Sequence, residues 1–222
     1  MLLLGIDTSA AVGACLHDGT AVLAEAHEYD PRRHAELLTP MVTDALERAG
    51  RQRGDLTGVA VGVGPGPFTG LRVGLMTARV LGLTLGVPVH GVCSLDALAA
   101  EAAGADDLAG GFVVATDARR REVYWARYDG AGRRVDGPHV GPPAEVDRRG
   151  LPAVGRGAVA YREVLPGPDG PLDARAAHVA AIAARALADS APAGGTALLP
   201  PEPLYLRRPD AVEPGRRKSV LP

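Results

Sequence analysis

Lysine is almost absent from this sequence of 222 residues, and cysteine and aromatic residues are scarce. The one lysine is Lys218, close to the end of the chain, so Schiff-base chemistry and lysine clamps on phosphate groups are effectively excluded. The two cysteines, Cys15 and Cys93, each lie in an apolar, strand-like run. This position favours buried thiols over a disulfide or a metal site.

Long hydrophobic runs are also missing. No stretch approaches the roughly 18 uninterrupted apolar residues of a membrane span, and the N-terminal MLLLGID is too short for a signal peptide. We therefore expect a cytoplasmic protein with no membrane segment. Apolar residues still make up 46% of the chain, enough for a substantial core. The 24 basic and 26 acidic side chains exclude a strongly basic nucleic-acid binder but not a local basic patch.

The apolar patterns predict an α/β protein built from two similar halves. In the first half we expect strands at 2–7, 12–18, 20–28, 59–63 and 87–92, and helices at 33–49, at 69–85 and from Ser94 onward. In the second half we expect strands at 112–116, 121–129, 133–140 and 152–155, and helices at 143–149, 158–164 and 174–189. The Gly-, Ala- and Asp-rich stretch at 104–111 separates two lobes, 1–104 and 105–208, with a cleft between them and a disordered tail at 209–222.

The glycine-rich stretch GVGPGPFTGLRVG at 62–74 is similar at first sight to a nucleotide-binding loop. A P-loop needs Gly-Lys-Ser/Thr at its end, and this stretch has no lysine. A dinucleotide-binding loop needs a third glycine where this chain has Pro67 or Thr69. The stretch is therefore expected to shape a strand-to-helix turn, whose free amides are either capped by Thr69 or attract an anion.

Several polar residues are candidates for function. Asp7 and Asp117 each end the first strand of a lobe, where an acid either organises a metal and phosphates or simply caps a turn. His34 begins a helix, as an acid–base group or as a solvated capping residue. Arg119 to Arg121 form a dense charge run, and alternation along a strand turns at least one of them toward the lobe interface, a nucleotide or a partner.

The helix expected at 69–85 carries small residues at every fourth position, at Gly74, Ala78 and Gly82, and is apolar nearly all round. Such a stripe lets another helix approach closely. The stripe is covered either by a helix of another protein or by this chain's own sheet and first helix.

Six segments together resemble the TsaB (YeaZ) family of bacterial tRNA threonylcarbamoyladenosine synthesis. They are IDTSA (6–10), RRHAELLTPMV (32–42), GVGPGPFTGLRVGL (62–75), LGVPVHGVCSLDAL (85–98), DARRREVYWARY (117–128) and PLYLR (203–207). The resemblance implies an actin-like, Hsp70-like (ASKHA) α/β fold of two ribonuclease-H-like lobes. It also implies a non-catalytic protein that binds and activates TsaD, the paralogue that transfers a threonylcarbamoyl group to adenosine 37 of tRNAs reading ANN codons.

The resemblance also implies partners and contact residues. TsaD forms a heterodimer with this chain, the TsaE ATPase joins the complex, tRNA is reached through the complex, and the chain alone forms a homodimer. No cofactor of its own is expected, and ATP or ADP is expected only at the interface of the complex. Interface residues are expected at Leu37, Met41, Leu71, Gly74, Leu75, Ala78 and Gly82. Contacts to a nucleotide or to the interface are expected at Asp7, Thr8, Ser9 and Arg119.

The catalytic paralogue binds a metal through two histidines, and Ser94 and Leu98 stand at the corresponding positions here. A hydroxyl and an isobutyl group do not hold a divalent ion, so no metal site is expected, and Ser94 is interpreted as a helix N-cap. The alternative function is that of an actin-like ATPase or phosphotransferase using Asp7. A metallopeptidase would need the missing histidines.

Overall fold

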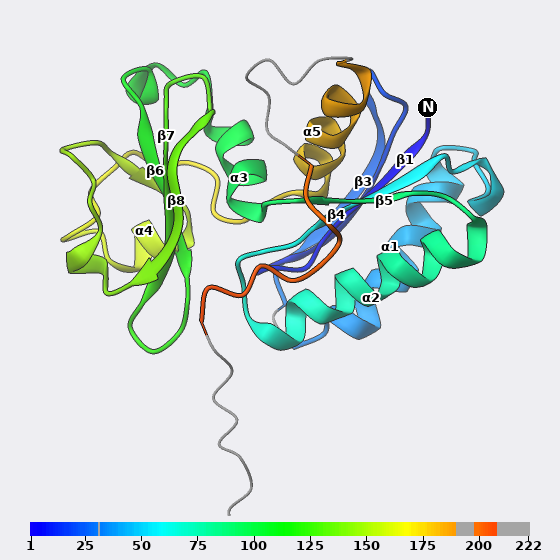
Figure 1. The fold of residues 1–222 in the computed structure, drawn as a ribbon, viewed down its shortest axis with the longest axis horizontal. Coiled ribbons are helices and arrows are strands. Elements are labelled where there is room, and N and C mark those ends of the chain that lie inside the picture. The colour runs from blue at the N-terminus through cyan, green and yellow to red at the C-terminus, as the bar shows by residue number, and fades with distance from the viewer. Residues whose placement is uncertain (31, 190–197, 208–222) are drawn as a thin grey trace, which may run out of the picture.

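The computed structural model describes residues 1–30, 32–189 and 198–207, and it places two α/β lobes side by side (Figure 1). The expected tail at 209–222 lies outside the described residues. Each lobe is organised around one mixed sheet, in agreement with the fold class predicted from the sequence.

The first lobe contains a five-stranded sheet in the order β3-β2-β1-β4-β5. Its strands are β1 (Leu3–Asp7), β2 (Val12–His17), β3 (Val22–Glu28), β4 (Gly58–Gly62) and β5 (Val89–Val92). The first three strands form the expected antiparallel meander, with the expected turn at Asp18-Gly19, and β4 and β5 add in parallel. Because strand side chains alternate between faces, Leu4 and Ile6 face one core and Leu3 faces another.

Helices cover both faces of this sheet. On one face lie α1 (His34–Arg48) and α2 (Phe68–Leu85), whose buried residues share a core with β1, β2 and β4. On the other face lie α3 (Ser94–Ala102) and α5 (Ala176–Ala188). A parallel strand pair needs such cover, because both of its faces are apolar.

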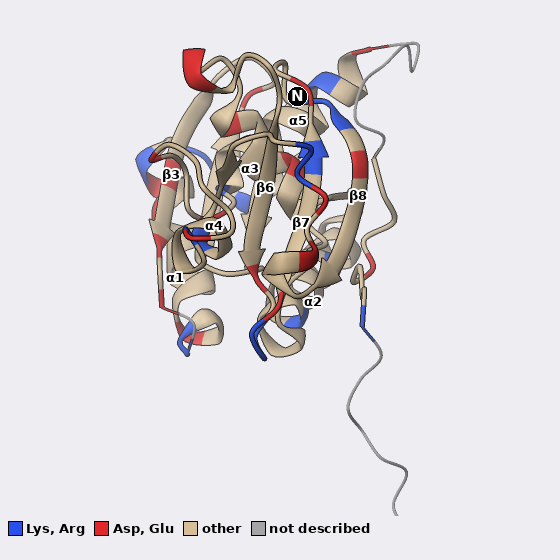
Figure 2. Cartoon of the chain, turned by 90° about the vertical axis from the view of Figure 1, so that its left-hand side faces the viewer, with Lys and Arg blue, Asp and Glu red and all other residues tan. Residues whose placement is uncertain are grey.

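The second lobe contains a four-stranded sheet in the order β8-β7-β6-β9. Its strands are β6 (Phe112–Asp117), β7 (Val123–Tyr128), β8 (Arg134–Gly141) and β9 (Ala153–Val154). Phe112 and Tyr128 pack on α3, while the opposite face packs around the short helix α4 (Arg156–Ala160). In Figure 2 the strands of this sheet lie in front of α3, which therefore separates the two sheets.

Two expected helices differ from the structure. The stretch 143–149 contains only a single 3₁₀ turn at Pro143–Glu145, because the backbone is already extended at Val146, with a ψ of 115°. The helix expected at 158–164 begins earlier and is one turn long, as α4. Its first residue follows Gly155, whose positive φ of 105° makes the sharp entry.

The chain returns to the first lobe after the second sheet. Helix α5 packs on β1, β2 and β4, although it lies beyond the expected boundary near residue 104. Leu199 then forms an antiparallel bridge with Gly91 of the edge strand β5, and the Leu204 amide donates to the Val63 carbonyl at 2.8 Å. Figure 1 shows this orange-red segment passing beside β5.

Helix α2 is the one described helix that is long and apolar enough to cross a membrane, with a mean hydropathy of 1.2. A helix in the core of a soluble protein meets the same criterion, so the observation is weak evidence for a membrane. In this fold α2 packs on β4 and β1 along one side.

Candidate functional site

Asp7, at the end of β1, is buried and held by three donors. Its Oδ1 accepts from the Ser9 amide at 2.8 Å and from the Ser9 hydroxyl at 2.6 Å, and its Oδ2 accepts from the Ser94 hydroxyl at 2.7 Å. Burial raises the pKa of Asp7, while these hydrogen bonds act to lower it. The carboxylate therefore joins the end of β1 to the start of α3, with its oxygens already engaged.

The glycine-rich turn packs directly on this network. The Ser94 hydroxyl accepts from the Gly64 amide at 3.1 Å, and a Cβ added at Gly62 would lie 1.8 Å from Asp7 Oδ2. A Cβ at Gly66 would meet the Ser9 carbonyl oxygen at 2.6 Å. These close approaches support the prediction that the glycines shape a strand-to-helix turn.

The expected capping roles are wrong at both helix starts. Cys93, not Ser94, is the N-cap of α3, and Ser94 instead bonds Asp7 and Gly64. Pro67 is the N-cap of α2, without a side-chain cap, and Thr69 is exposed beside the cleft described next. Leu98, one helical turn after Ser94, is fully buried in the core between the lobes.

The lobes enclose a cleft of about 230 Å³. From the first lobe it is lined by Thr8, Ser9, Tyr29, His34 and Thr69, and from the second by Thr116, Asp117, Arg119, Arg156 and Asp173. The structure thus brings together three of the four residues expected to contact a nucleotide or an interface. Asp7, the fourth, is one layer deeper and does not line the cleft.

Each arginine of the cleft already has an acidic partner. Arg119 Nη1 lies 3.3 Å from Asp117 Oδ2. Arg156 donates to both carboxylate oxygens of Asp173, with its Nε 2.9 Å from Oδ1. The Arg156 guanidinium also stacks on the Tyr29 ring, 3.5 Å from its centre. The positive charge of the cleft is therefore largely balanced by its own carboxylates.

His34 is not solvated, contrary to one of the expected roles. It is only 8% exposed, and its Nε2 lies 3.1 Å from the Ala10 carbonyl oxygen. Arg33, the preceding residue, is the N-cap of α1. The histidine therefore holds the start of α1 against the loop after β1.

The cleft offers few free side chains to a nucleotide or to a metal bound with it. The carboxylate of Asp7 already accepts three hydrogen bonds from Ser9 and Ser94, and both arginines are paired. In the described part of the chain, no three His, Cys, Asp or Glu side chains are grouped so as to hold a metal ion.

Sequence reasoning missed Tyr29, Arg156 and Asp173. Arg156 begins the one-turn helix α4, and Asp173 lies in a loop 17 residues further along the chain. Tyr29 comes from the other lobe. No local motif joins them, so only the folded chain shows that they meet.

The small-residue stripe of α2 faces the chain's own sheet. A Cβ at Gly74 would lie 2.4 Å from Thr8 Oγ1, and one at Gly82 would lie 2.3 Å from Val89 Cγ2. Ala78 is fully buried between them. The expected interface residues Leu71, Gly74, Leu75, Ala78 and Gly82 are thus buried inside the lobe, and Leu37 and Met41 of α1 are half-buried.

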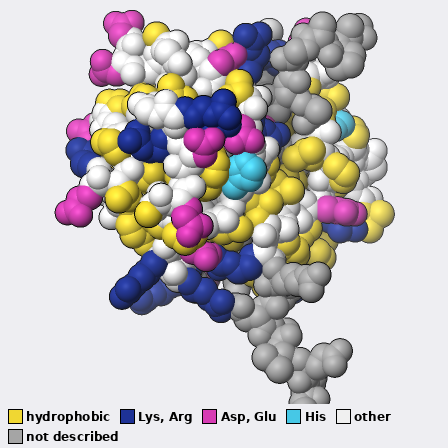
Figure 3. Space-filling model, turned by 60° about the vertical axis from the view of Figure 1, so that its left-hand side comes forward, with side chains coloured by type: hydrophobic (Ala, Val, Ile, Leu, Met, Phe, Trp, Pro, Cys, Tyr) yellow, Lys and Arg dark blue, Asp and Glu magenta, His cyan; other side chains and the backbone are white. Residues whose placement is uncertain are grey.

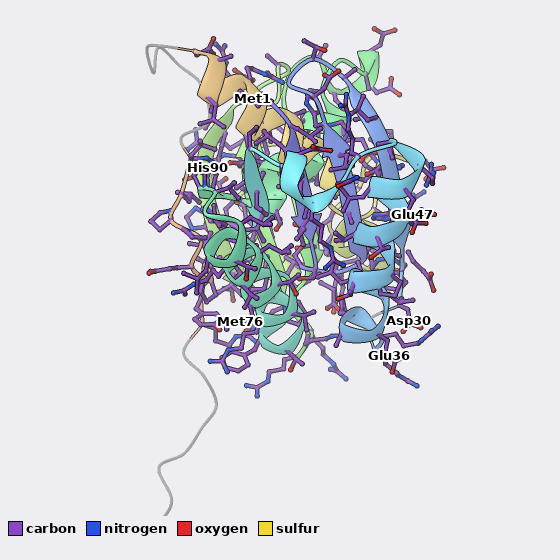
Figure 4. The ribbon with its side chains drawn as sticks, turned by 90° about the vertical axis from the view of Figure 1, so that its right-hand side faces the viewer. Met1, Asp30, Glu36, Glu47, Met76 and His90 are labelled. Carbon is purple, nitrogen blue, oxygen red and sulfur yellow. The ribbon has the colours of Figure 1, made fainter. Side chains whose placement is uncertain are left out.

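The opposite side of α2 is apolar and exposed. Met76 is 57% exposed, Val80 55% and Leu83 86%, and their spacing of four and three residues places them on one side of the helix. Figure 4 shows Met76 on the outer side of α2, with α1 and its Glu36 and Glu47 on the same side of the molecule. We call Met76, Val80 and Leu83 the outer stripe.

Comparison with known proteins agrees with this architecture. The family described as TsaD: tRNA N6-adenosine threonylcarbamoyltransferase matches residues 26–157. The structure of YeaZ from Pseudomonas aeruginosa superposes with a TM-score of 0.78 at 31% identity, over 92% of this chain and 99% of that chain. The protein therefore has the two-lobed, actin-like (ASKHA) fold of the TsaD-related proteins.

Relatives found by sequence identify the family to which the chain belongs. An uncharacterized Mycobacterium tuberculosis protein is 43% identical over 94% of this chain and 92% of its own length. An uncharacterized Mycobacterium leprae protein is 44% identical over 95% of this chain, and Escherichia coli TsaB, a tRNA threonylcarbamoyladenosine biosynthesis protein, is 40% identical over 58%. The matches span 56% and 55% of these two relatives. The chain belongs to the TsaB (YeaZ) family.

Proposed function

We propose that this chain is a non-catalytic partner that binds and activates a TsaD-type transferase. The reaction is the formation of N6-threonylcarbamoyladenosine at position 37 of tRNAs reading ANN codons. The observation that carries the proposal is the outer stripe of α2, because large apolar side chains aligned on an exposed helix mark a site for another protein. Membership of a family whose curated members are named for this biosynthesis supports the choice of reaction.

Helix-on-helix packing is the mode of docking that the stripe supports. Met76, Val80 and Leu83 present a ridge at i, i+4 and i+7, which fits between the side chains of an opposing helix. Leu37 and Met41 of the neighbouring helix α1 are half-buried and pack against the same core as α2. The partner's two matching helices would complete a four-helix interface, and in the chain alone the same stripe would form a homodimer.

The engaged carboxylate of Asp7 supports a role without chemistry of its own. An ATPase or phosphotransferase using Asp7 would need this side chain open to a metal and phosphates, and it is buried under Ser9 and Ser94. We propose that any ATP or ADP in the complex lies between the two proteins rather than in the 230 Å³ cleft. The TsaE ATPase and tRNA then reach this chain within a complex in the cytoplasm.

The docking proposal is tested with the double variant Met76→Glu, Val80→Glu. Both positions are exposed, so the fold should be retained, while two buried charges at the interface should weaken transferase binding at least about 10-fold. Val135→Glu is the matched control, because Val135 of β8 is 61% exposed in the other lobe. Calorimetric titration that gives the double variant the affinity of the wild type would overturn this docking surface.

A further inference from the structure

The β6–β7 turn has an unusual backbone. Arg119, Arg120 and Arg121 have φ values of 60°, 54° and 62°, so three consecutive residues with side chains adopt the left-handed conformation. Such residues occur singly as a rule, because the Cβ approaches the carbonyl oxygen at each of them. An ordinary hairpin would place glycine or asparagine here. The turn therefore holds three arginines in a conformation that their side chains disfavour.

Neighbouring groups hold this turn from both ends. The Asp117 carboxylate accepts from the Arg119 amide at 2.8 Å, and the Glu122 amide donates to the Arg119 carbonyl at 3.0 Å. Arg207, from the segment that returns along the first lobe, donates to the Ala118 carbonyl at 3.3 Å and pairs with Glu122. The acids nearest the turn are thus already engaged, and its backbone is fixed before any ligand arrives.

The turn presents its arginines at one end of the molecule. All three residues are exposed, and in the described part of the chain Arg121 has no ion pair. Figure 2 shows the blue turn below β6 at the same end of the molecule as the blue segment just before α1, and Figure 3 shows arginine side chains gathered along the lower edge of this face. The outer stripe, in contrast, lies on α2 in the first lobe.

Arginine is suited to phosphate, since its planar guanidinium forms paired hydrogen bonds with phosphate oxygens. We propose that the Arg119–Arg121 turn binds the phosphate backbone of an RNA. The turn lies in the second lobe at the lip of the cleft, which Arg119 lines, whereas the outer stripe proposed for docking lies on α2 in the first lobe. This inference rests on the proposed function for the identity of the RNA, which would be a tRNA. The recognition of phosphate depends only on the arginines of the turn.

The test uses the double variant Arg120→Gln, Arg121→Gln. Arg119 is kept because it pairs with Asp117 and lines the cleft. The matched control is Arg51→Gln, Arg53→Gln, which removes two exposed arginines from the loop between α1 and β4. Anisotropy of labelled tRNA is measured over a series of salt concentrations, with the chain alone and with its complex with the transferase, and transferase binding is titrated separately.

We expect the turn variant to weaken tRNA binding about 10-fold, and the control to leave it unchanged. The slope of log affinity against log salt should fall by about 1.5, since each lost phosphate contact removes roughly 0.7–0.9. Equal affinity and slope for variant and wild type would overturn the proposal. A variant that loses transferase binding but not tRNA binding would show a protein contact instead, and would also overturn it. If no complex forms, the proposed function fails, while tRNA binding by the chain alone still decides the RNA contact.

Discussion

Replacing Gly74 by alanine tests which side of α2 faces the first sheet. In an exposed helix, alanine is more favourable than glycine by about 0.5–1 kcal/mol. If the small-residue stripe were exposed in the isolated chain, Gly74→Ala should therefore stabilise the protein. In this structure the new Cβ would lie 2.4 Å from Thr8 Oγ1 and 3.3 Å from Ile6 Cγ2. The two arrangements therefore predict effects of opposite sign.

The magnitude follows from the role of the Thr8 hydroxyl. It donates to the Gly70 carbonyl at 2.8 Å and accepts from the Gly74 amide at 3.1 Å, so it cannot move away without breaking a buried hydrogen bond. A buried group left unsatisfied costs about 1–3 kcal/mol, and an overpacked methyl costs a similar amount. After the helix gain is subtracted, we expect Gly74→Ala to lower the free energy of unfolding by about 1–5 kcal/mol.

Urea unfolding of the isolated chain measures this difference. Thr84→Ala on the exposed side of α2 is the control, because it changes helix propensity without a buried contact and should be neutral or slightly stabilising. A Gly74→Ala protein as stable as the wild type, or more stable, would refute the packing of the stripe on β1.

Three further predictions concern titratable groups. Asp7→Asn keeps an acceptor for Ser9, removes the acceptor of the Ser94 hydroxyl and removes a buried charge, so the free energy of unfolding should change by no more than about 1–2 kcal/mol and support of threonylcarbamoylation should persist. If the folded variant no longer supported threonylcarbamoylation, the alternative in which Asp7 takes part in the chemistry would be favoured. Burial raises the pKa of Cys15 and of Cys93 to about 12, so both thiols should resist a thiol reagent at about pH 8 until denaturant is added. Rapid labelling of the native protein would contradict this burial. Burial also lowers the pKa of His90 below 6.5, so the unfolded chain takes up the proton more readily and stability contributed by this group is lost as pH falls below that value. His90→Leu should reduce the difference in unfolding free energy between about pH 7.5 and about pH 5.5. An unchanged difference would contradict the lowered pKa of His90 in the folded protein.

The strands, the hairpins and the long helices could be predicted because their signals are local. Alternating or continuous apolar runs ended by Asp18-Gly19 and by Gly86 contain both the element and its boundary. The duplicated order of elements then indicated two lobes. The short helix α4 and the proline turn at 143–145 were misjudged, because few residues define them and tertiary contacts fix their ends.

The side of α2 that faces outward could not be predicted. A helix that is apolar nearly all round has no period that distinguishes its two faces, and small residues suit a sheet as well as a partner helix. Only the positions of Thr8 and Val89 show that the stripe is internal, which leaves the outer stripe exposed. Ser94 was misjudged for a related reason, since its hydrogen-bond partner Asp7 is 87 residues away.

The most direct test of the account is formation of threonylcarbamoyladenosine in a reconstituted mixture. The mixture contains tRNA, the TsaD-type transferase, the TsaE ATPase and the enzyme that makes the threonylcarbamoyl-adenylate donor, with wild-type chain, with the Met76→Glu, Val80→Glu variant, or without the chain. The account predicts product only with the wild type and the Val135→Glu control, and none from the chain alone. Equal product in the absence of this chain would contradict its role as an activating partner.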